Sequence, residues 1–288
     1  MFLRDIYSKN NTVISYEIFP PKNDETGEKL EVLYSELEKL KKYKPSLVSV
    51  TYGAGGSNRS QSFEIVSHIK NNLELNVMPH FTCVCSKKED IEKYLSEIEK
   101  LEIKNILALK GDEPQDIIVC YRDFRYANEL VEFIKSETNL SIAVAGYPEA
   151  HIDAPSLEVD IQNLKRKIQA GGEVIFTQMC FDNDKFFNYY EKLQKQNINV
   201  PIAFGVLPIL SYKQFSKMME MAKVSIPKKL LEGIEKYKDN SDDIKKLSID
   251  FTTEQCQQLI DSKMVSGLHF YTLNKAFSTS KILDNLDL

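Results

Sequence analysis

The sequence predicts an α/β protein of the (β/α)8 TIM-barrel class, folded as a single domain over residues 1–288. Short apolar runs alternate along the chain with longer amphipathic runs. This alternation is typical of parallel strands joined by right-handed helical crossovers. Eight such units fit into the 288 residues, a chain length that suits a closed eight-stranded barrel.

Each expected strand ends at residues that do not continue a strand. The first ends at Pro20-Pro21, because proline has no N–H to donate to a β-ladder. The second ends at a glycine-rich stretch that begins at Gly53, and the fourth ends at Gly111 and Pro114. The strands are expected at 13–19, 46–51, 77–83, 105–109, 141–145, 174–178, 202–207 and 267–273.

The amphipathic runs between these strands predict helices. Apolar residues recur at helical spacing in the first of them, which is expected at 26–43. Another ends near residue 71, a third covers 88–101, and a later one carries Lys165-Arg166-Lys167. Several helical stretches precede the last strand; Pro227 begins one, and 239–243 forms a polar turn.

An open, doubly wound sheet is the competing fold. Its dinucleotide-binding form would place G-x-G-x-x-G after the first strand. This chain has Pro20-Pro21-Lys22-Asn23 there, and no low-complexity linker divides it. The closed barrel is therefore the better prediction.

The amino-acid composition argues against several classes of protein. The formal net charge is −5, which gives no support for a nucleic-acid partner. No apolar run approaches membrane-spanning length, and residues 1–10 do not resemble a signal peptide. The five cysteines lack the spacing of a disulfide framework or of a structural zinc site, so we expect a cytoplasmic protein without a bound metal.

Polar side chains interrupt the apolar pattern where the expected strands end. In barrels of this class the carboxyl ends of the strands form one mouth, where the chemistry takes place. A site at this mouth is therefore predicted. The polar strand-end residues are Glu17, Thr51, Tyr52, His80, Thr82, Lys110, Asp112, Tyr147, His151, Gln178, Tyr271, Asn274 and Lys275.

Glu17 is the clearest catalytic candidate, because it is a carboxyl group within an apolar strand. Such surroundings disfavour the ionised form of a carboxyl group. A carboxyl group that stays protonated near neutral pH suits a general acid. The alternative is a structural carboxylate paired with a nearby lysine.

For the other candidate site residues, a structural role is the alternative to ligand binding. Asp112 follows Gly111, which allows close backbone approach to a ligand, but it could be an ordinary turn residue. His80 and His151 suit hydrogen bonding to a ligand better than metal ligation, and a core histidine is the alternative.

Two segments could bind phosphate. The glycine-rich stretch 53–57 precedes a helix, although most such loops are merely tight turns. Asp160, Asn163, Arg166 and Lys167 share one helix face, which suggests either a diphosphate clamp or a solvated surface.

These strand-end strings, taken together and in order along nearly the whole chain, resemble methylenetetrahydrofolate reductase in its bacterial single-domain form. No single string is specific, but the ordered set is. The matching strings are Tyr16-Glu17-Ile18-Phe19-Pro20-Pro21-Lys22, Val50-Thr51-Tyr52-Gly53-Ala54-Gly55-Gly56, Pro79-His80-Phe81-Thr82-Cys83, Ala108-Leu109-Lys110-Gly111-Asp112, Ala145-Gly146-Tyr147-Pro148-Glu149-Ala150-His151, Asn163-Leu164-Lys165-Arg166-Lys167, Thr177-Gln178 and His269-Phe270-Tyr271-Thr272-Leu273-Asn274.

The resemblance implies a noncovalent FAD and NADH or NADPH as the hydride donor. It implies that methylenetetrahydrofolate is reduced to methyltetrahydrofolate by ping-pong hydride transfer through the flavin, with Glu17 as proton donor and Asp112 stabilising the cationic iminium. The implied folate contacts are Glu17, Asp112, Gln178, Gln214 and Lys275. The implied FAD contacts are Thr51, Tyr52, Ala54, His80, Lys110, Gly111, Asp112, Ala127, Tyr147, His151, Asp160, Asn163, Arg166 and Lys167.

Three residues depart from the family pattern. Lys110 and Lys275 each stand where arginine is usual, which keeps the charge but removes the planar bidentate fork. Met218 stands where a phenylalanine is expected to stack on substrate or nicotinamide. None of the three removes the acid at Glu17.

The resemblance also implies a homo-oligomer, either a dimer or a tetramer, that acts in one-carbon metabolism and methionine biosynthesis. We expect no C-terminal regulatory domain, because the chain ends just after the eighth barrel unit. Two other functions remain open: a pterin-binding methyltransferase barrel that uses no flavin, and a non-catalytic protein that binds flavin or folate on the same scaffold.

Overall fold

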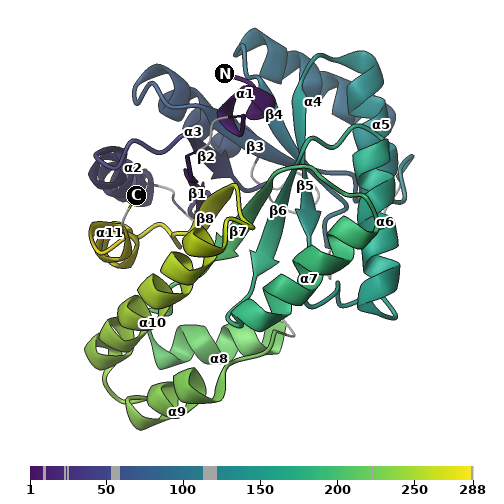
Figure 1. The fold of residues 1–288 in the computed structure, drawn as a ribbon. Helices are drawn as coiled ribbons and strands as arrows, with labels where there is room; N and C mark the ends of the chain where they lie inside the picture. The colour runs from purple at the N-terminus through teal and green to yellow at the C-terminus, as the bar shows by residue number, and fades with distance from the viewer. Residues whose placement is uncertain are drawn as a thin grey trace.

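The strands form a closed parallel barrel in chain order, which confirms the predicted fold class (Figure 1). The computed structural model describes residues 1–8, 11–22, 24, 26–52, 59–112, 122–221, 224–286 and 288. The stretch 53–57, which was expected to bind phosphate, lies outside the described residues. It includes Ala54, one of the expected FAD contacts. The strands are β1 Val13–Ile18, β2 Leu47–Val50, β3 Val77–Thr82, β4 Asn105–Leu109, β5 Ser141–Gly146, β6 Val174–Met179, β7 Ile202–Val206 and β8 Gly267–Tyr271.

The observed strand ends lie within two residues of the expected ones. The eighth strand was expected to reach Leu273, and this was wrong. It ends at Tyr271, because Leu273 and Asn274 have φ angles of 50° and 58°. Left-handed backbone of this kind cannot continue a strand.

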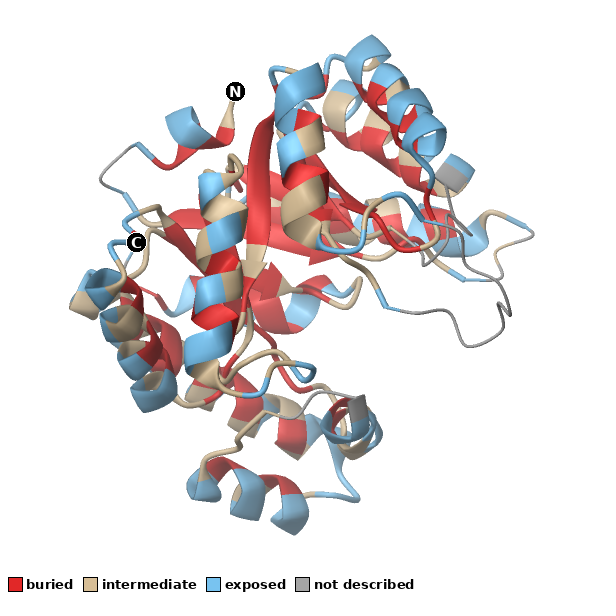
Figure 2. Cartoon of the chain, turned by 90° about the vertical axis from the view of Figure 1, so that its right-hand side faces the viewer, coloured by how far each residue is buried: buried red, intermediate tan, exposed pale blue. Residues whose placement is uncertain are grey.

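Helices surround the barrel and pack their apolar faces on its outer wall, so that buried and exposed residues alternate around each helix (Figure 2). The helices are α1 Leu3–Ile6, α2 Glu28–Lys41, α3 Arg59–Asn71, α4 Lys88–Lys100, α5 Ala127–Glu137, α6 Leu157–Gln169, α7 Asn183–Lys195, α8 Tyr212–Met221, α9 Lys228–Lys236, α10 Ser241–Ser262 and α11 Ala276–Asp284. None of the described helices is both long and apolar enough to cross a membrane.

The lower interior of the barrel is filled by apolar side chains. Inward residues at the amino ends of the strands, such as Leu47 and Met78, pack against Leu3 and Ile6 of α1. Asn105 fixes this short helix, since its side chain accepts from the Leu3 N–H at 2.8 Å and donates to the Met1 carbonyl at 3.0 Å. This floor leaves the carboxyl ends of the strands as the open end.

Helices α8 and α9 and the start of α10 form a lobe that extends beyond the barrel (Figure 1). The lobe has its own apolar cluster, which includes Leu207, Phe215, Met218 and Ile234. Glu149, in the segment after β5, accepts hydrogen bonds from the backbone N–H and the hydroxyl of Ser225 in this lobe. The lobe is therefore tied to the mouth of the barrel.

The cysteines differ from the expectation in one case. Cys83, Cys180 and Cys256 are free and buried, whereas Cys85 is disulfide-bonded. Spacing along the sequence did not indicate this, because disulfide geometry depends on which segments fold together.

Phe204 of β7 gives a direct test of the core on the outer wall. Its side chain is fully buried, and its ring meets that of Phe186 edge to face, with centroids 4.9 Å apart. Phe204→Ala should lower the free energy of unfolding by about 3–5 kcal/mol, because it leaves a cavity. Chemical denaturation measures this loss. Phe277→Ala is the control, since Phe277 is 58% exposed and should change stability little.

Candidate active site

Polar residues on the inner wall lie above the apolar floor. Alternate residues of a strand point to opposite faces. Thus Ser15 and Glu17 of β1, Ser49 of β2, His80 of β3 and His269 of β8 are buried polar residues among apolar strand neighbours. The register pairs Glu17 with Ser49 and Ser15 with His269 on adjacent strands. A buried polar layer therefore lies between the floor and the mouth.

Glu17 lies between two histidines. One carboxylate oxygen, Oε2, is 3.6 Å from Nε2 of His80 and 3.6 Å from Nε2 of His269. Only 7% of Glu17 is exposed. No lysine in the described parts of the chain lies within ion-pair distance of Glu17, so the structural lysine pair considered above is not observed. A carboxyl group enclosed in this way fits a proton donor.

His80 is neutral over the physiological range. Burial lowers its pKa to about 4, and the nearby Glu17 carboxylate only partly opposes this effect. Its Nε2 atom is buried and has no hydrogen-bond partner among the described residues. A buried nitrogen without a partner is costly unless a ligand or water supplies one. His80 is thus poised to contact a ligand.

The backbone around Glu17 is fixed by the segment after β8. Thr272 donates its hydroxyl to the Glu17 carbonyl at 2.8 Å. The Asn274 side chain accepts from the Phe19 N–H at 2.9 Å and donates to the Phe19 carbonyl at 2.7 Å. These bonds close the barrel at its mouth, and they hold the acid in place.

A cavity of about 660 Å³ opens above Glu17. The predicted folate contacts Glu17, Asp112, Gln178 and Gln214 line it together. Thr51, His80, Tyr271, His269 and Met218 also line it, so Met218 reaches the cavity as well as the lobe core. The cavity combines apolar walls with a few polar groups, which is typical of small-molecule sites.

Two adjoining cavities, of about 390 and 620 Å³, extend from the mouth over the ends of β4 and β5. Tyr147 lines both of them and the Glu17 cavity as well. The larger cavity is lined by the predicted FAD contacts Gly111 and Asp112. The smaller cavity is lined by the other predicted FAD contacts of this region, namely Lys110, Ala127, Tyr147, His151, Asp160, Asn163, Arg166 and Lys167.

The α6 residues in the smaller cavity are electrostatically coupled. Burial lowers the pKa of Lys167 to about 8, although Asp160 opposes this shift, and burial raises the pKa of Asp160. Lys167 donates to the Ala145 carbonyl at 2.5 Å. Arg166 donates to Asn163 at 3.0 Å. An enclosed cation beside a carboxylate suits a ligand that carries both phosphate and hydroxyl groups.

Other predicted residues lie apart from the cavity linings. Tyr52 packs on the rings of Phe81 and Tyr94. Lys275 precedes α11 and is exposed. Two neighbours of the site were not singled out from sequence. Asp153 lies 3.6 Å from the Lys110 amine, and His269 contacts Glu17. Strand alternation relative to Tyr271 was the signal that could have found His269.

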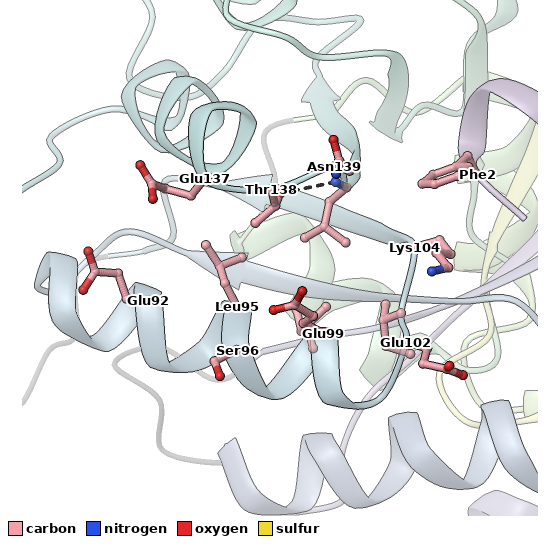
Figure 3. A pocket seen from close by; sticks show the side chains of 13 residues that line it. Phe2, Glu92, Leu95, Ser96, Glu99, Glu102, Lys104, Glu137, Thr138 and Asn139 are labelled. Atoms are coloured by element: carbon pink, nitrogen blue, oxygen red, sulfur yellow. Dashed lines mark hydrogen bonds between the residues drawn. The ribbon is translucent and has the colours of Figure 1, made fainter.

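A further cavity, of about 440 Å³, lies at the opposite end of the barrel (Figure 3). Its lining includes four glutamates and a lysine, namely Glu92, Glu99, Glu102, Glu137 and Lys104. The amino end of such barrels serves stability rather than chemistry. The described residues contain no group of three or more His, Cys, Asp or Glu that could hold a metal ion. The mouth is therefore the candidate active site.

Comparison with known proteins agrees with this geometry. The family model for methylenetetrahydrofolate reductase matches residues 2–287. The chain belongs to the methylenetetrahydrofolate reductase family. This confirms the resemblance seen in the ordered strand-end strings.

Curated relatives come from plants, yeasts and bacteria. The chain is 36% identical over 300 residues to methylenetetrahydrofolate reductase (NADH) 1 of Arabidopsis thaliana, covering 99% of this chain and 50% of that protein. It is 32% identical over 263 residues to 5,10-methylenetetrahydrofolate reductase of Escherichia coli (strain K12), covering 91% of this chain and 86% of that protein. The chain thus spans about half the length of the plant relative.

Solved structures share the fold at low identity. An uncharacterized protein from Clostridium thermocellum, which binds two copies of 5-methyl-5,6,7,8-tetrahydrofolic acid, has a TM-score of 0.65 and 16% identity, covering 98% of this chain and 96% of that one. Dihydropteroate synthase of Xanthomonas albilineans has a TM-score of 0.53 and 10% identity, covering 96% and 91%. At these identities the likeness concerns the fold alone.

Proposed function

We propose that the chain reduces 5,10-methylenetetrahydrofolate to 5-methyltetrahydrofolate, with FAD as resident cofactor and NADH or NADPH as hydride donor. The observation that carries this proposal is the Glu17 carboxyl group, enclosed by two histidines beneath a cavity of about 660 Å³. Family membership supports the folate substrate, and the plant relatives named for NADH support a nicotinamide donor.

The residues of the adjoining cavities fit FAD. Arg166 and Lys167 supply cations for a diphosphate, while Asp160 can accept from hydroxyl groups. From the neighbouring Glu17 cavity, His80 offers a buried nitrogen that lacks a hydrogen-bond partner within the described part of the chain. When bound, FAD would take up hydride from the nicotinamide and supply it to the folate. Lys110, Gly111 and Tyr147 would help to hold it at the mouth.

The folate step depends on two carboxyl groups of this chain. Glu17 would donate its proton to a nitrogen of the folate ring, which opens the ring to a cationic iminium. Asp112, in the same cavity, would stabilise that cation as a carboxylate. Gln178 and Gln214 would orient the pterin through hydrogen bonds. Because nicotinamide and folate would occupy the same cavity in turn, ping-pong kinetics are expected.

The remaining proposals concern the setting of the enzyme. We propose a single catalytic domain in a homo-oligomer, either a dimer or a tetramer, that acts in the cytoplasm. Its place would be one-carbon metabolism that leads to methionine biosynthesis. Neither a nucleic-acid partner nor a metal is part of this proposal.

The absorption spectrum of the purified protein, before and after incubation with FAD, tests the cofactor. A flavin spectrum that bleaches with NADH or NADPH and returns with methylenetetrahydrofolate is expected. A colourless protein that cannot be loaded with FAD would favour a pterin-binding methyltransferase. A flavoprotein that never passes hydride to folate would favour a non-catalytic binding protein.

A further inference from the structure

Lys217 is a charged residue of the candidate active site to which the proposed reaction gives no role. It lies on α8, in the lobe beyond the barrel, and it lines the same cavity as Glu17. Lys217 is exposed, whereas only 7% of Glu17 is exposed. The cavity therefore extends from the buried Glu17 to a rim where Lys217 meets solvent.

The charges around this cavity are unevenly placed. Among the described residues that line it, Lys217 is the one lysine or arginine, and Glu17 and Asp112 are the carboxyl groups. No carboxylate in the described parts of the chain lies within ion-pair distance of the Lys217 ammonium group. Lys110, by contrast, lies 3.6 Å from Asp153. A cation without a carboxylate partner at the rim of a cavity suits the anionic end of a ligand.

The neighbours of Lys217 on α8 also favour a ligand that accepts hydrogen bonds. Gln214 and Lys217 are three residues apart, so they lie on the same side of the helix. The Gln214 side-chain oxygen accepts from the Leu210 N–H at 2.6 Å, which leaves its NH₂ group to donate to a ligand. Met218 adds an apolar surface to the same cavity. This side of the cavity therefore suits a ligand segment that combines an apolar ring with acceptor groups.

Methylenetetrahydrofolate has these features in a matching order. The ring that Glu17 would open lies at the pterin end, a benzoyl ring follows, and a glutamate tail with two carboxylates forms the other end. When the pterin end lies over the buried Glu17, the tail is directed towards the rim. Lys217 is the cation that the described cavity lining offers there.

Lys275, the cation that the family pattern places at the folate, is not in position for this role. It precedes α11, it is exposed, and it does not belong to the described cavity lining. Its charge acts instead on Glu36 of α2, whose carboxylate accepts from the Ala276 N–H at 2.6 Å. A cation for the folate carboxylates is therefore available from α8 and not from the segment after β8.

We propose that Lys217 binds a carboxylate of the folate glutamate tail at the rim of the Glu17 cavity, and that it thereby selects substrates that carry this tail. The inference rests on the proposed function, since it takes folate as the substrate in that cavity. The contact lies far from the ring that reacts, so it strengthens binding and leaves the chemical step unchanged. Because it lies at the solvent, salt should screen it.

Calorimetric titration of the FAD-loaded protein with 5-methyltetrahydrofolate measures this contact without turnover. In Lys217→Met the Kd should rise about fivefold at low salt, as expected for an exposed ion pair. The difference should shrink below about twofold in roughly 0.5 M salt. Wild type and Lys217→Met should bind 5-methyltetrahydropteroate, which lacks the glutamate, equally well. Lys217→Arg keeps the charge and should recover most of the affinity for 5-methyltetrahydrofolate.

Anaerobic stopped flow shows whether the effect is confined to the folate step. In Lys217→Met, the methylenetetrahydrofolate concentration that gives half the limiting rate of flavin reoxidation should rise about fivefold. The limiting rate should stay within about twofold of wild type, and flavin reduction by NADH should be unchanged. Lys213→Met is the matched control, because Lys213 is an exposed lysine of the same helix outside the described cavity lining. It should behave as wild type in every measurement.

The outcomes distinguish this inference from the proposed function. If FAD-loaded wild type neither binds 5-methyltetrahydrofolate nor reduces folate, the proposed function fails, and the inference fails with it. If wild type reduces folate but Lys217→Met keeps wild-type affinity for 5-methyltetrahydrofolate, only the inference fails.

Three other results would also overturn the inference and leave the proposed function standing. An equal loss of affinity for the ligands with and without glutamate would assign Lys217 to the pterin or to the structure of the lobe. A loss in the reaction with NADH alone would assign it to the nicotinamide diphosphate. Weaker folate binding in Lys275→Met but not in Lys217→Met would restore the contact that the family pattern implies.

Discussion

Glu17→Gln is expected to abolish folate reduction while NADH still bleaches the flavin. The amide keeps the shape of the side chain but has no acidic proton to give, and general acids contribute about 10²–10⁴-fold to a rate. The hydride transfer from nicotinamide needs no proton from this position, so that half-reaction should be nearly unaffected. Single-turnover stopped flow, monitoring flavin bleaching and then its return with methylenetetrahydrofolate, measures both steps.

The control for this substitution is Glu191→Gln, which makes the same chemical change at an exposed position on α7. It should behave as wild type in both half-reactions. Wild-type folate turnover in Glu17→Gln would refute the role assigned to Glu17. Loss of flavin bleaching in the same variant would show instead that Glu17 serves the cofactor site.

Lys167→Met is expected to weaken FAD binding by about tenfold to a hundredfold near neutral pH, because a charge-assisted contact is typically worth about 1.5–3 kcal/mol. The wild-type protein should also lose affinity as pH rises. Burial lowers the pKa of Lys167 to about 8, so its ammonium group loses the proton needed to attract a diphosphate as pH passes that value. Affinity is thus greatest below this pKa and declines above it.

Titration of the apoprotein with FAD, followed by flavin fluorescence at several pH values, tests both statements. Lys167→Met should show little change with pH over the range in which wild type weakens. Lys165→Met, on the same helix but outside the cavity lining, should keep wild-type affinity and wild-type pH dependence. If wild type and Lys167→Met lose FAD affinity equally as pH rises, a titrating group other than Lys167 must cause that loss.

The barrel could be predicted from the sequence because its units are local. Each strand is a short apolar run that stops at proline, glycine or a polar residue, and each helix shows its own periodicity. Helix α1 was missed because four residues are too few to show a period. The lobe of α8 to α10 was recognised only as helical sequence, since its shape depends on the packing of an apolar cluster that includes Phe215 and Ile234.

The candidate site, like the fold, could be predicted from the sequence only in part. Residues at strand ends were expected to meet, and Glu17, Asp112 and Gln178 do line one cavity, together with Gln214 of α8, which only the family resemblance implied. The position of His269 beside Glu17 depends instead on register, which sets Glu17 and Ser15 of β1 beside the same imidazole. Barrel closure fixes that register, and no local pattern reveals it. Lys275 was expected at the folate but precedes α11 outside the cavity.

The apolar floor formed with α1 closes the amino end of the described barrel and leaves the mouth as the entrance to the site. Under the proposed function, nicotinamide and folate must both enter and leave through the mouth, and one can bind only after the other has left. Each substrate in excess should therefore obstruct the other. Steady-state rates would then pass through a maximum and fall as either concentration is raised, so the ratio of the two substrates, and not only their amounts, would set the flux.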